Sequence, residues 1–73
     1  MTPLIYFLNT LDARVNVTIL DKYADKFITD KAPLYTVLAN TQFIAEYGTS
    51  NAELRAISTV EGEYIVYIVV YND

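Results

Sequence analysis

The apolar pattern is strongest near the end of the chain, where residues 64–71 are all Ile, Val or Tyr. These residue types favour β-strands, and alternate residues of a strand point to opposite faces of its sheet. The first face comprises Tyr64, Val66, Ile68 and Val70, and the second comprises Ile65, Tyr67, Val69 and Tyr71. Because neither face is polar, we expect a central strand whose first face packs against a helix. The second face is left for another segment, another copy or a partner, although a one-residue register shift would exchange the two faces.

An N-terminal hairpin is predicted from residues 14–21, where Val15, Val17 and Ile19 alternate with polar residues until Leu20 breaks the pattern. This pattern is typical of a strand with one buried face. The polar stretch 21–25 then predicts a loop of five residues, and residues 26–29 form a short return strand.

Residues 32–47 have apolar side chains at helical spacing, which predicts one helix. The expected buried stripe is Leu34, Val37, Leu38, Thr41, Ile44 and Ala45, with Phe43 and Tyr47 at its edges. Thr29 or Asp30 is a suitable N-cap, and Gly48 can end the helix. The pair Asn40-Thr41 has low helix propensity, so the helix could split there.

The pattern in residues 4–11 fits either a helix or a strand. Thr2 as N-cap and Pro3 at the first helical position favour a helix. The apolar residues at helical spacing support it as well, namely Leu4, Phe7, Leu8 and Leu11. The run from Ile5 to Phe7 favours a strand, because its residue types suit a sheet. We favour the strand, followed by a turn.

Residues 52–60 are also ambiguous, because Ser50 and Glu53 match a capping box that would begin a helix. Against a helix, residues 57–60 favour a strand, and Glu61-Gly62 supplies a tight turn. We therefore favour a C-terminal hairpin of residues 54–60 with residues 63–71. A two-residue turn then places Ile57 opposite Val66 and Thr59 opposite Tyr64.

Together these elements predict an α+β fold for residues 1–73 as a single domain. The expected sheet is small and antiparallel, built from two hairpins with one helix packed on one face, in the order β-β-(β)-α-β-β. A chain of 73 residues is near the size at which one hydrophobic core barely suffices. The chain has neither Cys nor His, so neither a disulfide nor a structural zinc site of Cys and His can stabilise the fold. Stability must therefore come from packing, from oligomerisation or from a partner.

The net charge of the chain bears on the kinds of partner that it can bind. Nine acidic and five basic residues give a net charge of −4. This charge disfavours direct binding to nucleic acid or to an anionic lipid surface, because both are negatively charged. The apolar stretch 64–71 is too short to span a membrane as a helix, and the N-terminus lacks the features of a signal peptide. We expect a cytoplasmic protein, which the absence of Cys suits.

The sequence has few of the residue types that enzymes use in catalysis. We predict no enzyme, no catalytic residue, no cofactor and no metal site. Without His or Cys the chain lacks the commonest general base and a thiolate nucleophile. Its two glycines, Gly48 and Gly62, lie too far apart for a phosphate-binding loop. Asp21, Asp25 and Asp30 each precede a lysine and fail the spacing of a calcium loop.

Seven tyrosines are the remaining functional signal, since tyrosine is enriched in protein interfaces. The predicted partner-binding residues are Ile65, Tyr67, Val69, Tyr71, Glu61 and Glu63. We expect a non-enzymatic interaction module that self-associates through a sheet face and docks on a host or defence protein. An inhibitor encoded by a phage or mobile element has this small, acidic, cysteine-free composition.

Two alternatives come from other functional classes. The first is a small-ligand binder or enzyme with a pocket between subunits, in which Arg14, Arg55 and Lys31 are the candidates for holding an anion. The second is a structural subunit that adds its edge strand to a larger assembly.

Overall fold

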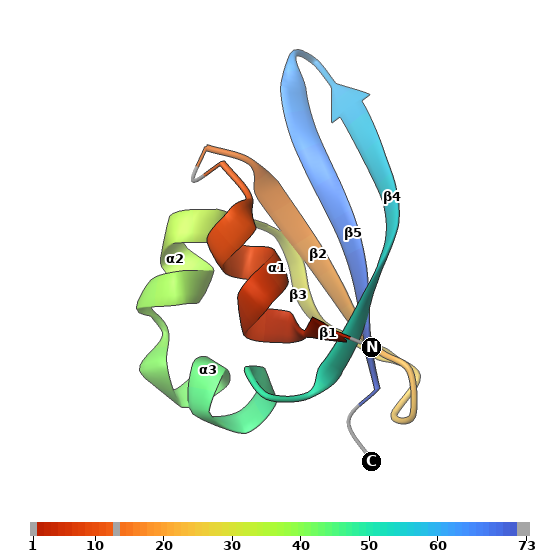
Figure 1. Ribbon diagram of the computed structural model, residues 1–73. Helices are drawn as coiled ribbons and strands as arrows, with labels where there is room; N and C mark the ends of the chain where they lie inside the picture. The colour runs from red at the N-terminus through yellow and green to blue at the C-terminus, as the bar shows by residue number, and fades with distance from the viewer. Residues whose placement is uncertain (1, 13, 72–73) are drawn as a thin grey trace.

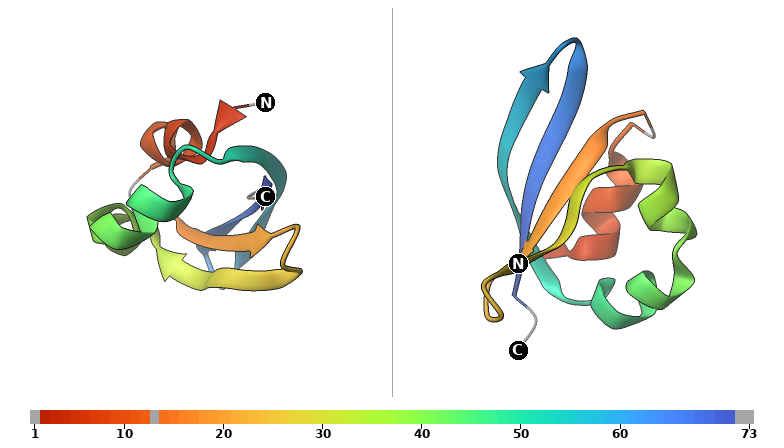
Figure 2. Two further views of the ribbon diagram at one scale, coloured as in Figure 1. Left: turned by 90° about the horizontal axis from the view of Figure 1, so that it is seen from below. Right: turned by 180° about the vertical axis from the view of Figure 1, so that it is seen from behind.

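The computed structural model describes residues 2–12 and 14–71. Five strands form one sheet, and three helices cover one of its faces (Figure 1, Figure 2). In chain order the elements are β1 (Thr2–Pro3), α1 (Leu4–Thr10), β2 (Asn16–Asp21), β3 (Lys26–Pro33), α2 (Leu34–Ala39), α3 (Thr41–Tyr47), β4 (Asn51–Val60) and β5 (Glu63–Tyr71). The chain therefore has the predicted α+β class, but with three helices where one was expected and with the two-residue strand β1 outside the two hairpins.

The sheet has the strand order β1-β4-β5-β2-β3, so β5 is central, as predicted. It pairs with β4 in antiparallel and with β2 in parallel orientation. The prediction of a purely antiparallel sheet is therefore wrong. The strands of each hairpin are antiparallel to each other, as predicted. The chain passes from β3 through α2 and α3 to β4, and β5 then lies beside β2 and runs in the same direction.

The N-terminal segment is the helix α1, so the preference for a strand there is wrong. Helical spacing places Leu4 and Leu8 on one side, where both are fully buried against the sheet. This burial outweighs the β propensity of the residues between them. Two N–H groups of the first turn also find acceptors, since Leu4 donates to Ser50 at 2.8 Å and Ile5 donates to Gly48 at 3.0 Å.

The N-terminal hairpin is present, but β3 is longer than the predicted return strand. Thr29 and Asp30 lie within β3 and do not cap a helix. The helix begins at Leu34 with Pro33 as its N-cap, and the predicted start at residue 32 is wrong. Pairing of β2 with β3 as far as Pro33 takes those residues into the sheet.

The single predicted helix is two helices, divided at Asn40, which is the weak point that the sequence indicates. The Asn40 side chain accepts a hydrogen bond from the N–H of Phe43 at 3.0 Å and so caps α3. Leu34 and Val37 of α2 are buried, while Phe43, Ile44 and Tyr47 of α3 pack at the margin of the core.

The C-terminal hairpin and its register are confirmed, with Ile57 opposite Val66 and Thr59 opposite Tyr64. Glu61 and Gly62 form the turn at φ values of 52° and 81°. Positive φ at both central residues is the type I′ geometry that suits the twist of two-residue hairpins.

The hydrophobic core lies between the helices and the sheet, where Val66, Ile68 and Val70 face α1 and α2 as predicted. The buried cluster comprises Leu4, Leu8, Val17, Ile19, Leu34, Val37, Ala52, Val66, Ile68 and Val70. Tyr64 was expected on the same covered face, but it is 57% exposed because the β4–β5 hairpin extends beyond the helices (Figure 1). Within residues 2–12 and 14–71, no helix has the length and apolarity needed to cross a membrane.

Candidate binding surface

The face of the sheet opposite the helices is here called the open face (Figure 2). Directly paired residues share a face of a sheet, so the register defines which side chains belong to it. Tyr67 of β5 lies opposite Thr18 of β2 and Ala56 of β4. Leu20 lies between Val69 of β5 and Phe27 of β3. The open face is therefore predominantly apolar across four strands.

The second face of β5 belongs to this surface, but it is less exposed than the sequence indicates. Ile65 and Val69 retain only 5% and 7% exposure within the chain itself, and Tyr67 and Tyr71 are half-buried. The expectation that this face needs cover from outside is wrong for Ile65 and Val69, because side chains of neighbouring strands enclose them. Self-association through this face stays a prediction.

A shallow groove of about 420 Å³ lies on the open face and is here called the open-face groove. Its lining comprises Thr18, Leu20, Phe27, Arg55, Ala56, Tyr67, Ile68 and Val69. Phe27 is 63% exposed at this groove and is the most accessible large apolar side chain of its lining. The sequence places Phe27 only in a return strand. The predicted five-residue loop 21–25 would place Phe27 opposite Ile19. The loop is one residue shorter, because Asp21 pairs with Lys26, and this places Phe27 opposite Leu20 on the open face.

A polar network borders the open face and holds Tyr71 in place. Arg55 Nη2 donates to the Tyr71 hydroxyl at 3.2 Å, and that hydroxyl donates to Glu53 Oε2 at 3.3 Å. Arg55 Nε also lies 3.4 Å from Glu53 Oε1. The Tyr71 ring meets Tyr23 edge to face, with centroids 6.2 Å apart. Tyr71 is thereby a positioned part of the surface rather than a free side chain.

The predicted acidic residues Glu61 and Glu63 are exposed at the tip of the β4–β5 hairpin. Glu63 Oε2 accepts a long hydrogen bond of 3.5 Å from Asn16 Nδ2 of β2. The two carboxylates therefore lie beside one end of the open face, whereas Tyr71 and Glu53 lie near the other end.

The three candidate anion-binding residues are not brought together as a site. Arg14 pairs with Asp12 at 2.8 Å, and Arg55 pairs with Glu53 as described above. Lys31 has a φ of 53° in the exposed strand β3. Since both arginines already contact carboxylates, the geometry gives little support to an anion pocket.

Asp21 has a structural role in the β2–β3 turn. Its side chain is buried, and Oδ1 accepts from the N–H groups of Tyr23 and Ala24, both at 3.1 Å. In the part of the chain that the structure describes, no three acidic side chains gather as a metal site would require.

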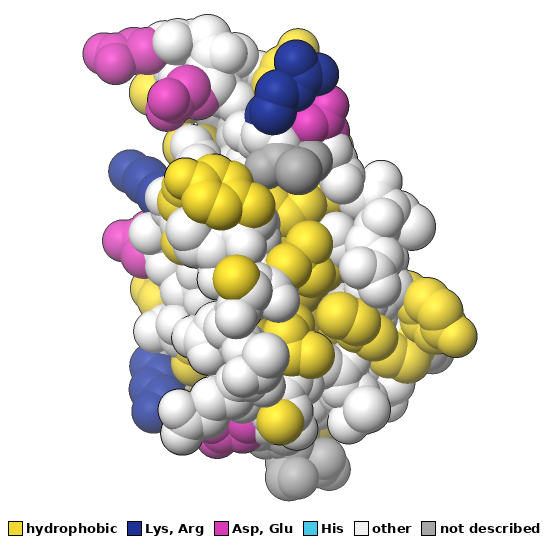
Figure 3. All heavy atoms as spheres, turned by 90° about the vertical axis from the view of Figure 1, so that its left-hand side faces the viewer, with side chains coloured by type: hydrophobic (Ala, Val, Ile, Leu, Met, Phe, Trp, Pro, Cys, Tyr) yellow, Lys and Arg dark blue, Asp and Glu magenta, His cyan; other side chains and the backbone are white. Residues whose placement is uncertain are grey.

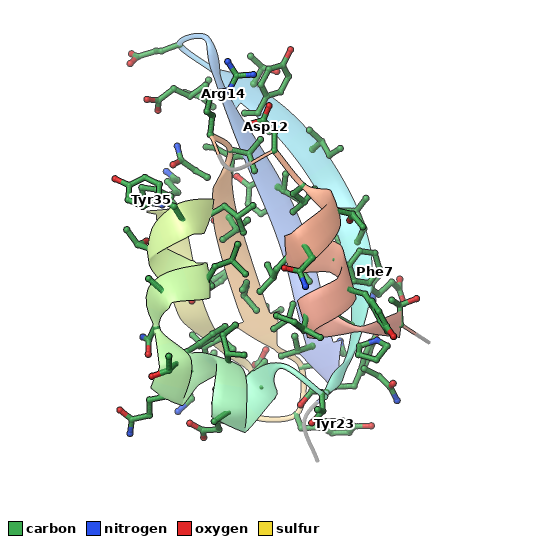
Figure 4. All side chains as sticks on the ribbon, turned by 60° about the vertical axis from the view of Figure 1, so that its left-hand side comes forward. Phe7, Asp12, Arg14, Tyr23 and Tyr35 are labelled. Carbon is green, nitrogen blue, oxygen red and sulfur yellow. The ribbon has the colours of Figure 1, made fainter. Side chains whose placement is uncertain are left out.

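The Asp12–Arg14 pair predicts a measurable pH effect (Figure 4). Hydrogen bonds from Arg14 lower the pKa of Asp12 from 3.8 to about 2. A folded-state pKa below the unfolded value stabilises the fold above about pH 4 and loses that contribution as the pH falls through about 2. NMR titration of the Asp12 carboxyl should give this pKa, and Arg14→Gln should raise it towards 3.8. An unchanged pKa in Arg14→Gln would contradict the assignment.

No family model, no curated protein and no solved structure matches this chain. Its function is therefore inferred from the geometry of its own surfaces.

Proposed function

We propose that this chain is a non-catalytic interaction module that binds a protein partner through the open face. The observation that carries the proposal is the open-face groove, which lies on the side of the sheet without helices. Among its lining residues, only Thr18, Arg55 and Tyr67 have polar side-chain atoms. Thr18 Oγ1 already accepts the N–H of Lys31 at 3.1 Å, and Arg55 is engaged by Glu53 and Tyr71.

This lining suits an apolar side chain of a partner better than it suits acid–base chemistry. General acid–base catalysis needs titratable groups directed at the reacting atoms. Protein interfaces instead combine an apolar centre with a polar rim. Phe27 and Tyr67 supply the apolar and aromatic area, and the Arg55–Glu53–Tyr71 network supplies the rim.

The partner segment that fits this surface is apolar with basic residues at one end. Glu61 and Glu63 are exposed beside one end of the open face, whereas Glu53 near the other end already contacts Arg55 and Tyr71. The net charge of −4 favours the approach of a basic partner. Of the predicted partner-binding residues, Tyr67 and Tyr71 contribute contact area, Ile65 and Val69 form the floor, and Glu61 and Glu63 add charge.

We further propose that docking inhibits the partner, as expected for a small protein of a phage or mobile element. A small interaction module can act by occupying a surface of its target. Titrating the captured partner's activity with the chain tests this role. An activity unaffected at saturating concentrations would leave the binding role and reject the inhibitory one.

Two matched variants test the binding face. Phe27 and Tyr35 have nearly equal exposure, 63% and 64%, but Phe27 lines the open-face groove whereas Tyr35 belongs to α2 (Figure 4). Affinity capture from a lysate of the host cell should retain one partner with Tyr35→Ala and lose it, by at least about tenfold, with Phe27→Ala. Circular dichroism checks that both variants remain folded. A partner retained by Phe27→Ala and lost by Tyr35→Ala would place binding on the helical side.

The control is needed because the helical side also presents hydrophobic groups. Figure 3 shows hydrophobic side chains on that side in groups bordered by backbone atoms and other side chains. Tyr6 and Tyr35, from α1 and α2, are 62% and 64% exposed. Separated groups of this kind are common on protein surfaces and do not by themselves define an interface.

A further inference from the structure

The two edges of the sheet differ in how they are protected from pairing with another strand. At the β3 edge, pairing with β2 is broken by two register shifts, Lys31 has a φ of 53°, and Pro33 has no N–H. Irregular pairing, charge and proline are the usual devices that block edge-to-edge association. The β3 edge is therefore unsuited to accept a strand.

The β4 edge lacks most of this protection over residues 56–60. β1 pairs with β4 only at Asn51 and Ala52, and within residues 2–12 and 14–71 no strand lies along the rest of its outer edge. A register shift between Leu54 and Ala56 interrupts the strand, but pairing is regular from Ala56 to the turn. This segment, Ala-Ile-Ser-Thr-Val, has no charge and no proline.

Backbone groups on this edge point outward at two defined residues. In a two-residue hairpin the pair next to the turn, here Val60 and Glu63, exchanges hydrogen bonds, and the following pairs alternate. Thr59 and Ile57 therefore direct their N–H and C=O groups away from β5. The Ile57 side chain is 60% exposed, since the hairpin extends beyond the helices (Figure 1).

We propose that two copies of this chain pair through their β4 edges, antiparallel about a two-fold axis at Ser58. This register places Ile57 opposite Thr59 of the second copy. The outward N–H and C=O groups of one strand then form hydrogen bonds with those of the other. Ser58 is the middle of the regular stretch from Ala56 to Val60, so this axis pairs all five of its residues, whereas an axis at Ile57 would leave part of the stretch unpaired. At each end of the paired stretch Arg55, which also contacts Glu53 in its own chain, lies near Glu61 of the second copy. An axis at Ile57 would instead bring Glu53 towards Glu61, and this like-charge contact disfavours it.

The product is one continuous sheet across both copies. A two-fold axis perpendicular to the sheet keeps the open faces on the same side, so the two open-face grooves become neighbours. Two linked grooves would strengthen binding to a partner with two docking segments. Dimer formation itself does not depend on the function proposed above, because the outward backbone groups belong to Ile57 and Thr59, and neither residue lines the groove.

Sedimentation equilibrium from about 1 μM to 1 mM tests the proposal, since short interfaces of this kind give weak dimers. The unmodified chain should dimerise, and Thr59→Pro should raise the dissociation constant at least about tenfold. Proline at position 59 removes an outward N–H and leaves the pairing with β5 intact. Its thermal unfolding, measured well below the dissociation constant, should match that of the unmodified chain.

A charge exchange tests the register without relying on proline. Arg55→Glu and Glu61→Arg should each weaken the dimer about three- to tenfold, and the double variant should restore it. Tyr35→Ala and Tyr67→Glu should leave dimerisation unchanged. A monomer at 1 mM, or a dimer that is insensitive to Thr59→Pro and lost with Tyr67→Glu, would overturn the proposal. The second result would place self-association on the open face.

Discussion

Replacing Ile68 with Ala should lower the free energy of unfolding by about 2–5 kcal/mol, the largest effect expected of any truncation in β5. Ile68 is 1% exposed and lies between Ile19 of β2 and Leu54 of β4 in the centre of the sheet. Truncation removes buried apolar surface and leaves a cavity under the helices. Urea denaturation followed by circular dichroism measures the change, which is a large part of the roughly 4–11 kcal/mol expected for a domain of this size.

Ile57→Ala is the matched control for this prediction. Ile57 points to the same face of the sheet as Ile68, since it pairs with Val66, but it is 60% exposed. Its truncation at low protein concentration should cost less than about 1 kcal/mol, because little buried surface is lost. Equal losses for the two variants would show that the core is not where the structure places it.

Replacing Asp21 with Ala should cost about 1–3 kcal/mol, because it leaves the N–H groups of Tyr23 and Ala24 without their acceptor. Asp21 is 4% exposed, so water reaches its side chain poorly. Asp21→Asn retains an oxygen acceptor in the same place and should cost distinctly less. Urea denaturation of the three proteins measures this difference. Equal costs for Ala and Asn would mean that the charge of Asp21, rather than its hydrogen bonds to the turn, matters to the fold.

Local patterns were sufficient for the elements whose partners are close in sequence. The run of Ile, Val and Tyr in residues 64–71 identified the central strand, and Glu61-Gly62 determined the register of the C-terminal hairpin. Asn40 was recognised as a weak point, because its side chain competes with helical hydrogen bonding and favours a cap.

Features that depend on distant contacts were missed. Residues 4–10 form a helix because Leu4 and Leu8 meet a sheet built from the rest of the chain. The parallel pairing of β2 with β5 likewise depends on the path through α2 and α3. The spacing of Leu4 and Leu8 does fit a helix, but the local sequence alone could not show that their burial outweighs the β propensity of the residues between them. The parallel pairing leaves no periodic signal in the local sequence.

The candidate binding surface was predicted in part. Alternation placed Ile65, Tyr67, Val69 and Tyr71 on one face, but it could not show how far neighbouring strands enclose Ile65 and Val69. Phe27 was missed because its contribution depends on lying beside Leu20 across the hairpin. Face assignment follows from a period of two, whereas exposure depends on tertiary packing.

The parallel contact between β2 and β5 also has a consequence for biosynthesis. Val17 pairs with Val66, so the middle of the sheet cannot close until the polypeptide has been translated as far as β5 and that stretch has left the ribosome. Until then, the first hairpin and α1 lack the strand against which they would pack. The nascent chain should therefore acquire protease resistance only after β5 has emerged, with its apolar segments accessible to chaperones in the meantime.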